Sequence, residues 1–124
     1  MRFDENSNVI WTHDKLFHHS LEFDHEGNMW ACSAYEDSAD YRPYRGDQIV
    51  KLNPETGKVL FQTNIDDIFR ENPYHDYSKL YRNTNDPYHL NDVQPVLTNS
   101  KYWNVGDVFI SVKSFNCVFL YRPA

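Results

Sequence analysis

Residues 19–33 decide the fold of this chain, and they read HSLEFDHEGNMWACS. Apolar or alternating runs lie on both sides of residues 24–28, in which Gly27 can supply the positive φ of a tight turn. This pattern predicts a β-hairpin with strands over 19–23 and 29–33. A second hairpin is predicted over 48–63, because residues 53–58 form a Pro/Gly turn between two further apolar runs.

The rest of the chain contains more short runs of this kind and one segment with a different pattern. Strands are predicted at 8–11, 92–97, 107–112 and 117–121. After the second hairpin, Ile65, Ile68 and Phe69 recur at helical spacing behind two aspartates, and Pro73 ends the pattern. The following residues up to 87 are polar and aromatic without a period. We therefore predict a short helix followed by a loop, inserted over about 64–88.

A weak internal repeat links the two groups of strands. Ile-Val-Lys-Leu-Asn-Pro at 49–54 resembles Val-Phe-Leu-Tyr-Arg-Pro at 118–123, and each stretch follows a pair of predicted strands. Repeated four-stranded meanders are typical of β-propeller blades, and a whole propeller has roughly 4 to 8 of them. We therefore predict an all-β fold, namely a fragment of a β-propeller with about two four-stranded antiparallel blades.

The predicted fragment is a single partial domain over 1–124. Residues 1–13 are expected to end a preceding blade, residues 14–63 to form one blade, and residues 89–124 to form an incomplete next blade. The helix and loop of the insertion lie between these two blades. Such a fragment has unpaired strand edges, which can pair with a second copy of the chain. Self-association through exposed blade edges therefore stays open.

Composition excludes several classes of partner. The chain has 124 residues, enough for about one domain. Its 12 Lys and Arg against 18 Asp and Glu give a net charge of -6, which argues against nucleic acid or an anionic membrane as the main partner. No apolar run approaches the roughly 20 residues of a membrane span, and the first residues lack the apolar region of a secretory signal. The compartment stays open, since Cys32 and Cys117 are expected to be buried free thiols on strands.

Four histidines that lie close together in the sequence are the first candidates for chemistry. His13 follows a strand end, and His25 occupies a turn. Both positions are typical of solvated loop residues. His18 and His19 are adjacent on a predicted strand, where neighbouring side chains point to opposite faces. The two rings are therefore not expected to share a metal ion, and we predict no metal site.

A second candidate site lies at the start of a later strand. His89 and Asn91 are two positions apart, so they are expected on the same face, where an imidazole and a carboxamide can bind an anionic oxygen. His89 can also act as a nucleophile or a general acid. The alternative is a capped strand start in which His89 bonds locally. Lys113, at the end of an apolar strand, would complete an oxyanion clamp if it converges with these residues, and would otherwise extend to solvent.

Several common catalytic patterns are absent from the sequence. It contains no paired carboxylates of the glycosidase kind, no Gly-rich phosphate loop and no Gly-x-Ser-x-Gly motif. The commonest glycosidase, nucleotide-binding and serine-hydrolase functions are thereby excluded.

Taken together, residues 18–28, 53–61 and 86–93 resemble the arylsulfotransferase family, and the resemblance extends over most of 8–124. It implies a β-propeller enzyme that moves a sulfuryl group from an aryl sulfate to a phenol without a nucleotide donor and without a cofactor. Histidines, an asparagine and an arginine are implied to line a central funnel. The corresponding positions are listed here in chain order: His18 or His19, His89, Asn91 and, in place of the arginine, Lys113.

Two features depart from the family pattern. Lys113 keeps the positive charge of the arginine but lacks its two-pronged grip on a planar anion. The nucleophilic histidine that the resemblance implies would belong to a later blade, beyond residue 124, so the chain is expected to be a fragment that lacks it. A noncatalytic β-propeller module for ligand binding or interaction is therefore the alternative function.

The resemblance also implies roles for the site residues and the partners. His89, Asn91 and Lys113 would stabilise charge on the transferred group, while His18 or His19 would orient the donor oxygen or move the phenol proton. The partners implied are a small aryl sulfate and a phenol. Aromatic side chains in predicted loops could stack the phenol, although packing explains them equally well: Tyr35, Tyr41, Tyr44, Tyr74 and Tyr88.

Overall fold

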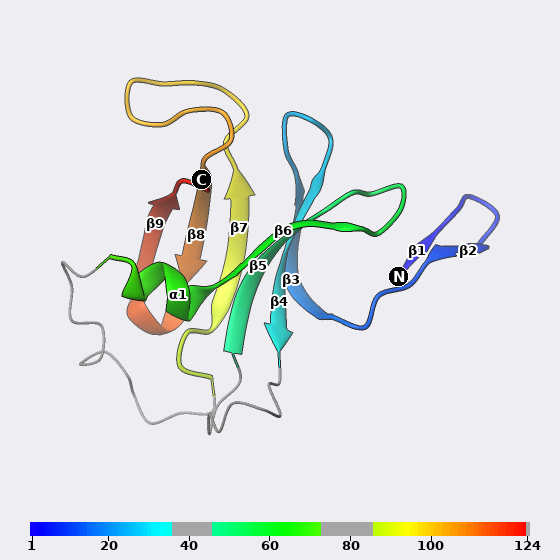
Figure 1. The fold of residues 1–124 in the computed structure, drawn as a ribbon, viewed down its shortest axis with the longest axis horizontal. Coiled ribbons are helices and arrows are strands. Elements are labelled where there is room, and N and C mark those ends of the chain that lie inside the picture. The colour runs from blue at the N-terminus through cyan, green and yellow to red at the C-terminus, as the bar shows by residue number, and fades with distance from the viewer. Residues whose placement is uncertain (36–45, 73–85, 124) are drawn as a thin grey trace.

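The computed structural model describes residues 1–35, 46–72 and 86–123 (Figure 1). Within these ranges the chain forms antiparallel sheets of two, four and three strands, with one short α-helix. The predicted all-β class is confirmed, and consecutive meandering sheets are consistent with part of a β-propeller. The strands are β1 (Arg2–Phe3), β2 (Val9–Trp11), β3 (Leu16–Phe23), β4 (Met29–Tyr35), β5 (Gly46–Leu52), β6 (Val59–Asn64), β7 (Leu90–Pro95), β8 (Val108–Val112) and β9 (Cys117–Tyr121).

The four-stranded sheet contains both predicted hairpins. Its strands follow chain order, β3-β4-β5-β6, and every neighbouring pair is antiparallel. Gly27, with φ +78°, turns the chain between β3 and β4. Gly57, with φ +71°, does the same between β5 and β6. Both turns therefore use glycine where a side chain would be strained.

The three-stranded sheet repeats the first three strands of the larger one. Its order is β7-β8-β9, again in chain order. The repeat noted in the sequence falls on β5 and on β9, and each of these is the third strand of its sheet. The similarity of the two stretches therefore reflects an equivalent place in two related sheets. The further division of the chain into blade segments stays a prediction.

The small sheet at the N-terminus contains a strand that the sequence pattern did not predict. β1 has two residues and pairs with β2. Arg2 connects β1 to the turn between β5 and β6. The Arg2 Nη1 atom donates to the Pro54 carbonyl oxygen at 2.6 Å and forms an ion pair with Glu55 at 2.9 Å. A two-residue strand is too short to show alternation, so only these tertiary contacts reveal it.

The predicted helix is confirmed as α1 (Ile65–Arg70), which follows β6 directly. Ile65 and Ile68 are buried, and Phe69 packs against Tyr88, as the spacing of apolar residues requires. Tyr88 is only 2% exposed and its hydroxyl donates to Asp66. The structure thus favours packing over substrate stacking for this ring. Most of the loop predicted up to residue 87, with Tyr74, lies outside the described residues, and so do Tyr41 and Tyr44 between β4 and β5. Tyr35 was expected in a loop, but it is the last residue of β4.

The main core lies between the two larger sheets (Figure 1). β4 and β5 supply one side and β7 and β8 the other, together with α1. Its buried members are Trp30, Cys32, Ile49, Ile65, Ile68, Tyr88, Leu90, Val93, Val108, Ile110 and Val112. A smaller cluster joins Met29, Val50 and Leu52 with the partly buried Trp11, Phe17 and Val59. Packing between the sheets therefore sets the position of β7 relative to β3.

The turn between β3 and β4 is held by the buried carboxylate of Asp24. One oxygen accepts the backbone N–H groups of Glu26 and Asn28, both at 2.9 Å. The other accepts Trp30 Nε1–H at 3.1 Å and lies 2.9 Å from Lys51 Nζ. Burial by itself raises the pKa of Asp24, but these hydrogen bonds outweigh it, so the pKa lies below its ordinary value.

This arrangement predicts a loss of stability in acid. A lowered folded-state pKa means that the stabilisation is present above the unfolded value near 3.8 and disappears as pH falls through the folded value. Urea unfolding between about pH 6 and about pH 3 measures this slope. Asp24→Asn should flatten the slope and, at neutral pH, lower the free energy of unfolding by about 1–3 kcal/mol.

Asp4 supplies a matched control for the Asp24 variant. Its Oδ1 accepts the N–H groups of Asn6 and Asn8 in a similar turn, but its surroundings are exposed and no lysine or indole contact is found for it among the described residues. Asp4→Asn should therefore change the acid slope less than Asp24→Asn. Equal slopes for the two variants would show that the buried contacts of Asp24 do not cause the effect.

Candidate functional site

The candidate site lies where the first strands of the two larger sheets meet. β3 begins the four-stranded sheet and β7 begins the three-stranded one. The backbone N–H of Val93 on β7 donates to Ser20 Oγ on β3 at 3.2 Å, which joins the two strands side by side. All three histidines of the sequence prediction, His18, His19 and His89, lie along this junction.

A β-bulge in β3 brings His18 and His19 together. The pairing of β3 with β4 shifts register between His18 and Leu21, and His19 has φ +57°. The expectation that the two rings face opposite sides of the strand is therefore wrong, because the extra residue interrupts the alternation. Their ring centroids are 4.9 Å apart in an edge-to-face arrangement.

The third ring comes from the neighbouring sheet. His89 immediately precedes β7 and has φ +50°. Its ring centroid lies 5.6 Å from that of His19, with the two planes tilted by 39°. His18, His19 and His89 thus form a continuous group of rings, which we call the histidine row. His19 is exposed, whereas His18 and His89 are partly buried, so a ligand can approach the middle of the row.

Each end of the histidine row has a carboxylate beside it. Asp47, on β5 and 1% exposed, has Oδ1 3.4 Å from His18 Nε2, and its Oδ2 accepts the Leu90 N–H at 3.0 Å. Asp86 lies 2.9 Å from His89 Nδ1. The contacts with Asp86 are the local bonding of His89 that the sequence left open as the alternative. Sequence reasoning assigned no role to Asp47, for which no local signal exists, since its contacts come from distant segments.

His18 differs from His89 in its hydrogen bonding. Both ring nitrogens of His18 are buried and have no hydrogen-bond partner among the described residues. The 3.4 Å approach to Asp47 therefore brings the imidazole and the carboxylate close without forming a directed bond. An unpaired buried polar group is costly, and such groups are found where a ligand or water completes the bonding.

The other two predicted site residues, Asn91 and Lys113, are not members of the histidine row. Asn91 lies at a second register shift, between Leu90 and Asp92, so the alternation that predicted it on the same face as His89 is interrupted. Lys113 begins the 3-10 turn η2 (Lys113–Phe115), and its N–H donates to the His89 carbonyl oxygen at 3.1 Å. Its side chain is exposed. Within the described residues, no hydrogen bond or ion pair joins the side chain of either residue to the histidine row.

The remaining sequence candidates lie outside the row. His25 is exposed in its turn, as predicted, but His13 is half-buried, with its ring 5.7 Å from that of Phe17. The cysteines are free thiols, as predicted, although Cys117 is only partly buried. Burial raises the pKa of Cys32 to about 12, so this thiol is not a nucleophile at neutral pH. Across the described ranges, no group of three or more His, Cys, Asp and Glu has a geometry that could hold a metal ion.

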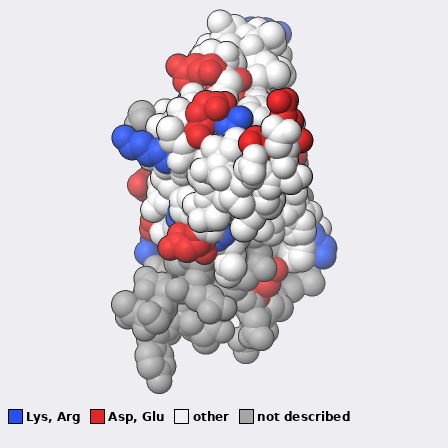
Figure 2. All heavy atoms as spheres, turned by 90° about the vertical axis from the view of Figure 1, so that its right-hand side faces the viewer, with Lys and Arg blue, Asp and Glu red and all other residues white. Residues whose placement is uncertain are grey.

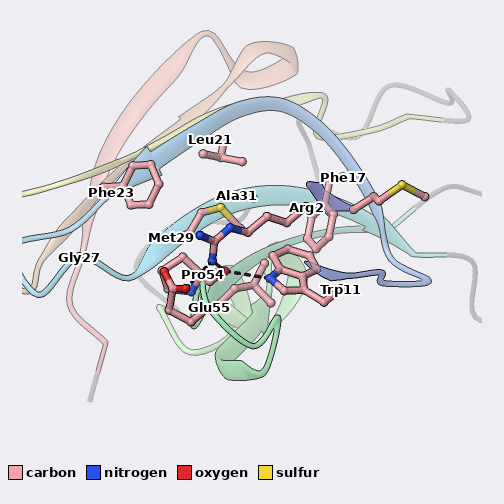
Figure 3. Close-up of a pocket in the computed structure, with 12 residues that line it drawn as sticks. Arg2, Trp11, Phe17, Leu21, Phe23, Gly27, Met29, Ala31, Pro54 and Glu55 are labelled. Atoms are coloured by element: carbon pink, nitrogen blue, oxygen red, sulfur yellow. Dashed lines mark hydrogen bonds and ion pairs between the residues drawn. The ribbon is translucent and has the colours of Figure 1, made fainter. Parts of the chain in front are cut away.

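An apolar hollow of about 630 Å³ lies on the face of the four-stranded sheet that is turned away from the main core (Figure 3). Met29 and Ala31 line it, and they alternate along β4 with the core residues Trp30 and Cys32. Its full lining is Met1, Arg2, Trp11, Phe17, Leu21, Phe23, Gly27, Met29, Ala31, Leu52, Pro54 and Glu55. None of these residues belongs to the histidine row, so the hollow and the row are separate features.

The surface of the described residues is largely uncharged on the side shown in Figure 2. Acidic side chains form small groups there, and the basic ones are scattered among them without forming a stripe. No helix in the described parts of the chain is long and apolar enough to cross a membrane.

The described part of the chain is nearly all β, and its antiparallel meandering sheets are consistent with a β-propeller fragment. Three histidine rings come together where the two larger sheets meet. The family model described as arylsulfotransferase (ASST) matches residues 1–124. The chain therefore belongs to the arylsulfotransferase family, and the resemblance predicted from the sequence is confirmed. Neither the curated proteins nor the solved structures that were searched gave a match.

Proposed function

We propose that this chain contributes the histidine row to the transfer of a sulfuryl group from an aryl sulfate ester to a phenol. One observation carries the proposal: residues from two sheets, His18, His19 and His89, meet as one group of rings in a chain of the arylsulfotransferase family. Imidazole rings can donate hydrogen bonds to sulfate oxygens and can also accept a proton. The row therefore has both functions that the reaction needs.

The row suits the charge changes of this reaction. As the bond between sulfur and the aryl oxygen breaks, negative charge lies on the sulfuryl oxygens and the leaving oxygen, so positioned donors lower the barrier. The partly buried ring of His18, whose nitrogens have no hydrogen-bond partner among the described residues, can donate to such an oxygen. The roles that the resemblance implied are thereby exchanged: His89, whose ring has a carboxylate beside it, would accept the proton of the phenol as the phenol oxygen becomes bonded to sulfur.

Asn91 and Lys113 are proposed to join the site when substrate is bound. The backbone bond from Lys113 to His89 keeps η2 beside the row, and the exposed lysine stem is long and flexible. A point charge from this ammonium would neutralise the sulfate without the planar grip of an arginine. The nucleophilic histidine that the family resemblance implies is proposed to come from outside this chain.

A noncatalytic function in sulfate-ligand binding is the second candidate. It is favoured by the exposure of Lys113 and by the absence, among the described residues, of a hydrogen bond or ion pair between its side chain and the histidine row. A site with the row but without a seated cation can hold an anionic ligand through ring N–H groups alone. Such a module would bind an aryl sulfate and release it unchanged.

One pair of assays tests both candidates. The complete protein, in which this chain is joined to the part that supplies the nucleophilic histidine, is incubated with 4-nitrophenyl sulfate, with and without added phenol, and the release of 4-nitrophenolate is followed by absorbance. Binding of the same ester is followed in parallel by calorimetry. Phenol-dependent release supports transfer, and binding without release supports the noncatalytic module. Neither binding nor release would overturn the assignment of the histidine row as a sulfate-ester site.

A further inference from the structure

We propose that Asp86 is a positioning residue that holds His89 in the tautomer with Nδ1 protonated and Nε2 free to accept a proton. The two oxygens of the Asp86 carboxylate contact the same residue. Oδ2 lies 2.9 Å from His89 Nδ1, and Oδ1 accepts the His89 backbone N–H at 3.1 Å. One carboxylate therefore restrains both the ring and the backbone of His89.

The backbone of His89 needs such restraint. Its φ of +50° lies in the left-handed region, which a residue with a side chain seldom adopts without support from its surroundings. Support comes from both sides: Asp86 binds its N–H, and the Lys113 N–H donates to its carbonyl oxygen at 3.1 Å. The neighbouring peptide is held in the same way, since the Ser114 N–H donates to the Tyr88 carbonyl oxygen at 3.1 Å.

The charge of Asp86 determines which ring nitrogen carries the proton. An ionised carboxylate has only acceptors, so a nitrogen 2.9 Å away must be protonated to bond with it. In the neutral ring this leaves Nε2 without a proton. When His89 takes a proton at Nε2, the carboxylate stabilises the imidazolium that forms.

This inference deepens the proposed function, and its catalytic consequence depends on that function. In the transfer step the phenol O–H bond breaks and an N–H bond forms at His89 Nε2. The phenol oxygen bonds to sulfur, and the electron pair of the broken sulfur–nitrogen bond stays on the nucleophilic histidine, which had taken the sulfuryl group from the aryl sulfate and released the aryl oxide. Asp47 does not serve His18 in the same way, because no directed hydrogen bond joins them. The two ends of the row are therefore unequal.

Nuclear magnetic resonance of ¹⁵N-labelled histidine tests the tautomer without any need for turnover. Long-range ¹H–¹⁵N correlations show which ring nitrogen is protonated, and the signals of His89 are those lost in His89→Asn. In the unsubstituted chain we expect protonation at Nδ1. Protonation at Nε2 in the unsubstituted chain would overturn the proposal.

Asp86→Asn tests the carboxylate itself, because it removes the charge and keeps the size of the side chain. Its amide oxygen can still accept the His89 N–H, whereas its NH₂ group facing Nδ1 favours the opposite tautomer. We expect the His89 signals to change to the pattern of protonated Nε2, while Asp86→Glu keeps the original pattern. An unchanged His89 pattern in a folded Asp86→Asn chain would also contradict the proposal.

The chain offers a second aspartate–histidine pair as a control. Asp14 lies 3.0 Å from His13 Nδ1, but it is almost fully exposed and lies outside the histidine row. Asp14→Asn should leave the His89 signals unchanged. If it altered them as much as Asp86→Asn does, the effect would be a general one and not that of a positioning residue.

A kinetic readout then separates this inference from the proposed function. If transfer occurs, Asp86→Asn should lower kcat by about 10²–10⁴-fold with little change in KM, as expected when the base has the wrong tautomer. Asp86→Glu should recover part of the rate. Unchanged kcat in Asp86→Asn would overturn the catalytic part of the inference. If the complete, unsubstituted protein shows no transfer, the proposed function fails, and the tautomer measurement still decides the role of Asp86.

Discussion

Replacing His89 is expected to lower kcat/KM for transfer from an aryl sulfate to phenol by about 10²–10⁴-fold, which is the usual contribution of a general acid or base. His89 is the member of the histidine row with a carboxylate bonded to its ring, so it is the ring best prepared to take the proton. His89→Asn is the preferred variant, because asparagine tolerates the left-handed backbone at this position better than alanine does.

The measurement is the release of 4-nitrophenolate by each variant, together with thermal unfolding to show that the chain remains folded. His25→Asn is the matched control, since this histidine is exposed in a turn and lies outside the row. It should leave kcat/KM unchanged. Full activity of a folded His89→Asn chain would show that the histidine row is not the site of proton transfer.

Gly57→Ala is expected to cause the largest loss of stability, about 2–5 kcal/mol. Gly57 has φ +71°, which strains any residue with a Cβ by about 1–2 kcal/mol. The added Cβ would also lie 2.7 Å from Trp11 Cδ2 and 2.9 Å from Cε3. The indole would have to move, and its hydrogen bond from Nε1 to the Pro54 carbonyl oxygen at 2.8 Å would be lost (Figure 3).

Gly27→Ala separates the two causes of this loss. Gly27 has φ +78°, but an added Cβ there meets nothing within 4 Å, so only the backbone strain remains. Urea unfolding should show a loss about 1–3 kcal/mol smaller for Gly27→Ala than for Gly57→Ala. In a Trp11→Ala background the two glycine variants should become alike. Equal losses in the unsubstituted background would show that the contact with Trp11 contributes nothing.

The parts of the fold that could be predicted from the sequence are those whose signals are local. The two hairpins and α1 were predicted because their signals are local, as in the turn around Gly27 and the spacing of Ile65 and Ile68. β1 was missed because two residues cannot show a period. Its contacts to Pro54 and Glu55 come from residues far along the chain. Strand boundaries also shifted, since β3 begins at Leu16, before the alternating run.

The candidate site was predictable only in part. His18, His19 and His89 were selected from their residue types and from the family resemblance, and the structure places their rings together. Asn91 and Lys113 were selected in the same way, but among the described residues no hydrogen bond or ion pair joins their side chains to the row. Their participation in a sulfate site therefore stays a prediction.

The amino-acid sequence alone determined the all-β class, the order of the hairpins and the short helix, because turn residues and alternation act over a few neighbouring positions. Only the tertiary structure decided which histidines meet. The bulge at His19 reverses the expected direction of its ring, and packing of β7 against β3 brings His89 to it. Bulges and contacts between sheets depend on what the whole chain buries, so no local pattern specifies them.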